Sequence, residues 1–76
     1  MTLTVTGYVS IPPGQPTKFD HGDVHLSTGA IFVAHTHAGT VEVIDLQSQR
    51  HIATIPGCLE ASGVLCVQSE DLVFAA

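Results

Sequence analysis

Short runs of β-branched and aromatic residues, interrupted every few positions by Gly, Pro, Ser or Asp, extend over the whole of this chain. No segment keeps its apolar residues at the 3.6-residue period of a helix. Apolar runs bounded by turn residues are typical of strands that pair in antiparallel hairpins. The sequence therefore predicts an all-β fold without a helix of useful length. The predicted strands are residues 3–6, 8–11, 23–26, 30–35, 40–46, 51–55, 64–67 and 72–75.

The chain also contains an internal repeat. Four positions recur 41 residues later: Gly22 as Gly63, Leu26 as Val67, Ile31 as Leu72 and Ala34 as Ala75. In both copies a short strand, a polar turn and a second strand follow one another. A period of about 40–45 residues with four strands per unit is typical of a β-propeller blade. The alternative is chance, because two hairpins in a small protein can look alike.

The central segment, IFVAHTHAGTVEVIDLQSQRHIATIPG over residues 31–57, resembles the YVTN-type β-propeller repeat. Residues 32–34 stand at its YVT core, residues 39–45 at its outer strand and residues 52–57 at its closing strand. The resemblance covers most of residues 19–75, whereas the first eighteen residues match poorly. It implies four-stranded blades in a closed ring of about six to eight, of which this chain holds about two.

That resemblance implies that the chain begins and ends within a blade. Residues 1–17 would supply two outer strands and a loop, residues 18–57 a complete blade, and residues 58–76 the two inner strands of another. The outer strands of one copy could complete the inner strands of the next, a head-to-tail contact of the kind that closes rings. We expect a homotrimer forming a six-bladed ring, with a tetramer as the alternative. A truncated piece of a longer propeller, without independent function, is the other alternative.

The charge balance argues against two classes of partner. Two basic residues face seven acidic ones, for a net charge of −5. This disfavours nucleic acid and anionic membrane surfaces as partners. No apolar run approaches the roughly 20 residues of a transmembrane helix, and the N-terminus lacks the features of a signal peptide. We therefore expect a cytoplasmic protein in which Cys58 and Cys66 are free thiols.

Loops at one rim of the predicted blade would collect the polar residues that could bind a small molecule at the channel. The ligand-binding candidates are Asp20, His21, His35, His37 and Glu60. His35 and His37 are two residues apart and would share one face of an extended strand. They are therefore also a candidate pair for a divalent transition metal, with Asp20, His21 or His25 as further ligands. Hydrogen-bonded imidazoles in a polar loop are the alternative.

Five predictions concern single residues. Asp45 should cap a turn, Cys66 should be a small buried side chain, and His51 should face solvent on the outermost strand. Phe32 and Ile44 should belong to the core between strands or blades. No catalytic residue is predicted.

Taken together, these features favour a non-catalytic, self-assembling propeller module with a His/Asp rim that binds a ligand. The alternative that the resemblance implies is a metal-dependent hydrolase of the lactonase type. Sites of that type use Glu, Asn and Asp from several blades, and this chain has no Asn.

Overall fold

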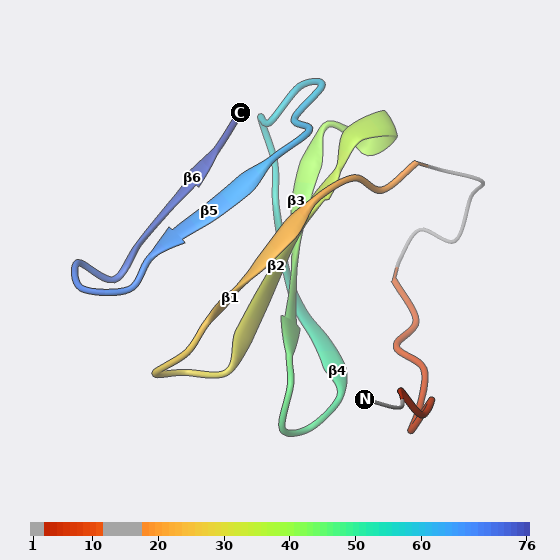
Figure 1. Cartoon of the computed structure of the whole chain (residues 1–76). Coiled ribbons are helices and arrows are strands. Elements are labelled where there is room, and N and C mark those ends of the chain that lie inside the picture. The colour runs from red at the N-terminus through yellow and green to blue at the C-terminus, as the bar shows by residue number, and fades with distance from the viewer. Residues whose placement is uncertain (1–2, 12–17) are drawn as a thin grey trace.

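Six strands form two antiparallel sheets in the part of the chain that this computed structural model describes, residues 3–11 and 18–76 (Figure 1). The four-stranded sheet has the order β1-β2-β3-β4, and β5 and β6 form a separate hairpin. The bounds are β1 Gly22–His25, β2 Ala30–His35, β3 Thr40–Asp45, β4 Arg50–Ile55, β5 Val64–Val67 and β6 Leu72–Ala75. The all-β prediction is confirmed, and these six strands lie within one residue of their predicted bounds.

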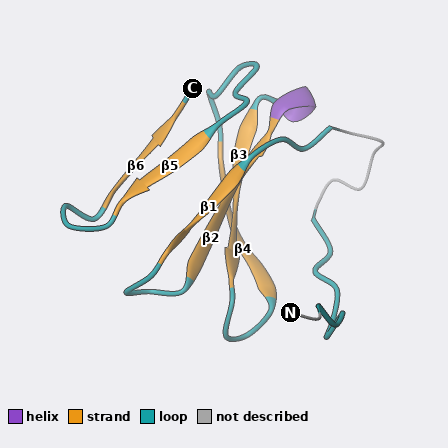
Figure 2. Ribbon diagram, in the orientation of Figure 1, coloured by secondary structure: helices purple, strands orange, loops and turns teal. Residues whose placement is uncertain are grey.

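A single turn of 3-10 helix, η1 (Thr36–Ala38), joins β2 to β3 at one end of the sheet (Figure 2). It ends at Gly39, which has a φ of 71° that favours glycine. Among the described residues no helix has the length and apolar character needed to cross a membrane.

The two strands predicted at the N-terminus do not form, because residues 3–11 carry no strand. A strand requires a hydrogen-bonding neighbour, and the expected neighbour was the inner hairpin of a second copy. The segment contacts the β3–β4 turn instead, where a Cβ atom on Gly7 would stand 2.6 Å from Oε1 of Gln49. Figure 1 shows it on the side of the sheet opposite to β5 and β6. Its side chains Leu3 and Tyr8 are 89% and 91% exposed.

The hairpins β1–β2, β3–β4 and β5–β6 close with four-residue turns whose last residue has positive φ. The turns are residues 26–29, 46–49 and 68–71. The φ angles are 74° at Gly29, 57° at Gln49 and 52° at Asp71. The first and third turns start at residues 26 and 68, so the two inner hairpins align at an offset of 42 residues. The predicted offset of 41 is therefore wrong by one, and such a slip exchanges the two faces of a strand.

The core lies between one face of the four-stranded sheet and the β5–β6 hairpin with its preceding loop. We call β1–β2 the first hairpin and β5–β6 the second hairpin. β5 packs against β1 and also touches β2. The buried apolar side chains are Ala34, Val41, Val43, Ala61 and Cys66. The prediction that Cys66 is a small buried side chain is confirmed, and burial, followed by the nearby Asp23 carboxylate, raises the pKa of its thiol.

Phe32 pairs with Val43, and Ile44 pairs with Ile31. Because neighbouring residues of a strand alternate in direction, Phe32 and Ile44 lie on opposite faces of the sheet. Both side chains are half-buried, and only the face that carries Phe32 is covered by the second hairpin.

Candidate functional site

Three loops meet at the end of the sheet where β2 gives way to η1. The Thr36 hydroxyl donates to the carbonyl of Ala61 in the loop before β5, at 2.6 Å. The backbone N–H of His21, in the segment before β1, donates to the carbonyl of Ser62 in the same loop, at 3.2 Å. These loops share one rim, as the sequence predicts.

Four of the five predicted ligand-binding residues are exposed on this rim. Asp20 and His21 are adjacent, with 3.2 Å between the carboxylate Oδ1 and the imidazole Nδ1. His37 lies in η1, and Glu60 lies in the loop before β5 with a φ of 56°. The strand ends at His35, so His37 does not share an extended strand with it as the metal prediction assumed. In residues 3–11 and 18–76 no group of three His, Cys, Asp or Glu side chains is placed to hold a metal ion.

His35, the fifth predicted residue, belongs to a buried polar cluster. The cluster is centred on the carboxylate of Glu42, which the sequence analysis did not single out. Glu42 of β3 is 1% exposed and lies among side chains from β2 and β4. Its Oε2 accepts hydrogen bonds from Nδ1 of His35 and the hydroxyl of Thr40, both at 2.7 Å. Its Oε1 accepts from Nε2 of His51 at 2.8 Å and the hydroxyl of Thr54 at 2.6 Å. Four donors therefore occupy both oxygens.

A β-bulge brings the second imidazole to this cluster. Val43 of β3 pairs with Ala53 of β4. The next residue of β3, Ile44, pairs with His51, so Ile52 is the extra residue of the bulge. Without it, His51 would point to the opposite face of the sheet. The side chain of His51 is only 16% exposed, so the prediction that it faces solvent is wrong.

The cluster holds Glu42 in its charged form. Burial alone would raise the pKa of this carboxyl, but the hydrogen bonds from Thr54, His35, Thr40 and His51 outweigh burial and lower the pKa to about 2. A carboxylate that hydrogen-bonds to imidazole can serve general-base catalysis. Here the carboxylate is enclosed and fully bonded, and the ring of Phe19 stacks on His35 with 4.2 Å between centroids. We assign the cluster a structural role in joining β2, β3 and β4.

One signal in the sequence points to this cluster. Glu42 interrupts the apolar run of β3, whose consecutive residues 41–43 are all buried. A buried carboxylate needs polar partners on neighbouring strands, and His35, His51 and Thr54 are the available ones. The bulge that aims His51 has no signature in the sequence.

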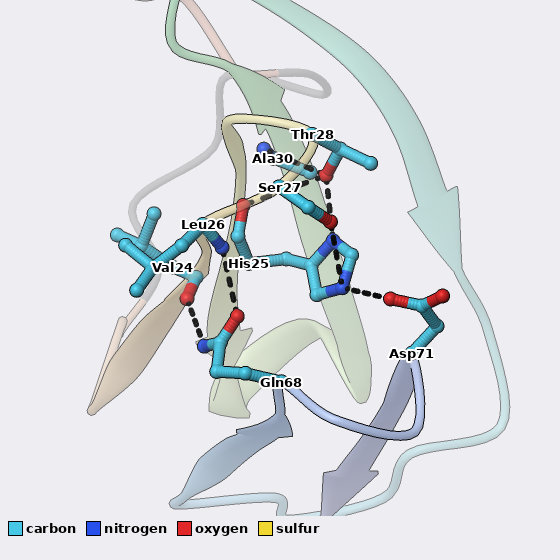
Figure 3. Close-up of polar contacts among 8 residues, drawn as sticks. All are labelled: Val24, His25, Leu26, Ser27, Thr28, Ala30, Gln68 and Asp71. Atoms are coloured by element: carbon cyan, nitrogen blue, oxygen red, sulfur yellow. Dashed lines mark hydrogen bonds and ion pairs between the residues drawn. The ribbon is translucent and has the colours of Figure 1, made fainter.

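A second polar cluster joins the four-stranded sheet to the second hairpin (Figure 3). Nε2 of His25 donates to Oδ1 of Asp71 at 2.8 Å, and its Nδ1 is hydrogen-bonded to the hydroxyl of Thr28 at 2.7 Å. Oδ2 of Asp23 accepts from the backbone N–H of Cys66 at 2.8 Å. This bond, followed by one from the N–H of Val24, holds the pKa of Asp23 below its usual range.

The side-chain amide of Gln68 pairs with the free edge of β1 as a strand would. Its Nε2 donates to the carbonyl of Val24 at 2.7 Å, and its Oε1 accepts from the N–H of Leu26 at 2.8 Å. Figure 3 shows both bonds beside His25 and Asp71. These contacts define the junction between the two hairpins, built by Asp23, His25, Gln68 and Asp71.

Replacing Gln68 with Ala should lower the free energy of unfolding by about 1 kcal/mol, because two backbone groups of β1 lose their partner near solvent. Gln68→Glu should cost more, since a carboxylate oxygen would then face the carbonyl of Val24. Urea unfolding measures both changes. Hydrogen exchange of the Leu26 amide is the specific check: it should accelerate in Gln68→Ala, and an unchanged rate would contradict this role.

Comparison with protein-family models, with curated proteins and with solved structures finds no match to this chain. Its function must therefore be inferred from its own residues and geometry.

Proposed function

We propose that this chain is a self-assembling β-propeller module that serves as a scaffold or binding protein. One observation carries the proposal: the chain forms a four-stranded, blade-like sheet and packs the two-stranded β5–β6 hairpin against it. We interpret this hairpin as half of a second blade. A half-blade of two strands leaves an open edge at β6 and an uncovered face. Uncovered sheet edges and faces of this kind promote association between chains.

The uncovered face of the second hairpin is apolar. Leu65 and Phe74 pair across it and are 59% and 57% exposed, and Leu72 beside them is 52% exposed. On the other side of the sheet, the N-terminal segment carries the unpaired apolar residues Leu3 and Val5. If its residues 3–11 add two strands to the half-blade of a neighbouring copy, each copy contributes two blades. Three copies then make a six-bladed ring, and four make an eight-bladed one.

The mass of the chain in solution tests this proposal. We expect light scattering at about 10–100 µM to give three times the mass of the 8.0 kDa chain, or four times for the tetramer. Removal of residues 1–11 should abolish the discrete oligomer, because the half-blade would lose its outer strands. A folded, monomeric wild-type chain across this concentration range would overturn the proposal.

The polar rim is the proposed binding surface of this module. His21 and His37 are exposed there, so replacing both with Ala should leave the melting temperature within about 2 °C of wild type. Binding of zinc or of small organic acids, measured by calorimetry, should be lost in the double variant. Equal binding by the two proteins would remove the rim from the proposal. His35 is unsuitable for this test, because it is hydrogen-bonded to Glu42 in the buried cluster.

The cysteines fit a cytoplasmic location for this module. Cys58 and Cys66 are both free thiols, and free thiols are typical of proteins in reducing compartments.

A further inference from the structure

The junction between the first and second hairpins lies inside one copy of the chain. Its residues indicate which residues would form an equivalent junction between the second hairpin of one copy and the first hairpin of another. The second hairpin packs on the face of the first that carries Asp23 and His25. At the offset of 42 residues, these positions correspond to Leu65 and Val67 of the second hairpin. The face that would receive the next hairpin thus has leucine and valine where the junction inside the chain has a carboxylate and an imidazole.

The partner side of the junction changes in the same way. Inside the chain, Gln68 and Asp71 reach back to the first hairpin. Their equivalents in the first hairpin are Leu26 and Gly29. Leu26 is 75% exposed although it is a large apolar residue in a turn. Each polar side chain of the junction inside the chain is therefore replaced by leucine, valine or glycine at the equivalent position.

One backbone donor explains why a carboxylate would not suit position 65. Inside the chain, the backbone N–H of Cys66 donates to Asp23. The equivalent N–H is that of Val24, and it already donates to Oδ1 of Asp23 at 2.8 Å. A carboxylate at position 65 would meet no free donor there, and a buried unpaired charge is costly.

We propose that the apolar face of the second hairpin, formed by Leu65, Val67, Leu72 and Phe74, docks the first hairpin of a second copy of this chain through its Leu26 turn. The inference rests on the proposed self-assembly and specifies its contact surface. The chain itself indicates the occupant, since it already places an equivalent hairpin on the equivalent face. At these four pairs of equivalent positions, the contacts within a copy are polar and the contacts between copies are apolar. The two kinds of junction therefore cannot exchange without leaving polar groups unpaired.

Two variants of exposed residues test this contact. Leu65→Asp damages the face and Leu26→Asp damages the turn. Each should weaken association at least about 100-fold, because a charge enters an apolar contact. Leu59→Asp is the matched control, since Leu59 is also a turn leucine, 86% exposed, and lies beside Gly39 at the end of the sheet away from the Leu26 turn. Circular dichroism should show the same strand content in all three variants and in wild type.

Mixing the two damaged chains is the decisive measurement. The Leu65→Asp chain keeps an intact turn and the Leu26→Asp chain keeps an intact face. A head-to-tail contact therefore predicts a one-to-one dimer, twice the mass of the chain, that neither variant forms alone. If wild type associates and the mixture stays monomeric, this contact is wrong while the proposed self-assembly stands. If both variants associate like wild type, the contact is also wrong. A monomeric wild-type chain would overturn both the proposed self-assembly and this contact.

Discussion

Replacing Glu42 with Ala should lower the free energy of unfolding by about 3–5 kcal/mol, the usual cost of removing one partner from a buried ionic cluster. The change leaves His35, Thr40, His51 and Thr54 without the acceptor that they share. A domain of this size has a total stability on the order of 5–10 kcal/mol, so the variant should be close to unfolded at 37 °C. Urea unfolding followed by circular dichroism measures the change.

The matched control is Glu70→Ala, because Glu70 is an exposed glutamate in the β5–β6 turn. Its replacement should change stability by no more than about 0.5 kcal/mol. Similar costs for the two variants would show that the buried cluster does not hold β2, β3 and β4 together.

The same carboxylate should make the wild-type protein sensitive to acid. Its pKa falls from 4.5 to about 2 on folding, so its contribution is fully present above pH 4.5 and is lost as the pH falls toward 2. The lost stability is at most about 3 kcal/mol, an upper value because the His51 side of the cluster is partly open to solvent. Glu42→Gln should be less stable at neutral pH and should lose less stability between pH 5 and pH 3 than wild type. If both proteins lose the same stability between pH 5 and pH 3, Glu42 is not the group responsible for the acid sensitivity.

The second large effect is expected at Phe32. Phe32→Ala should cost about 2–3 kcal/mol, below the range for a fully buried ring, because the side chain is half-buried. The ring lies on the sheet face that the second hairpin covers, so its loss should loosen both sheets. Thermal unfolding gives the change, and an unchanged melting temperature would place the ring outside the core.

Ile44→Ala serves as the comparison for Phe32→Ala. Ile44 is also half-buried, but it lies on the opposite face, which the second hairpin does not cover. Its cost should be smaller when the chain is diluted to the monomer. If the chain forms the proposed ring, the cost of Ile44→Ala should increase at concentrations where the ring assembles, because a neighbouring copy would cover that face. A cost independent of protein concentration would contradict packing on that face.

Local sequence determined the strands of this protein and most of their limits. Apolar alternation and turn residues place six strands within one residue of the observed bounds, because each hairpin forms from neighbouring residues. Asp45 caps the β3–β4 turn as predicted, accepting from the N–H of Ser48 at 2.9 Å. Local signals of this kind need no knowledge of what lies above or below the sheet.

Only the tertiary structure decided which faces those side chains occupy. The turns set the hairpin offset at 42 rather than 41, and this one-residue difference places Leu65 on the uncovered face of the β5–β6 hairpin. The bulge at Ile52 moves His51 from the expected solvent side to Glu42. Both results depend on hydrogen-bond register between strands, a property of two segments together that neither segment carries alone. For the same reason residues 3–11 read as strands in the sequence but form none, since a strand also needs the partner with which it pairs.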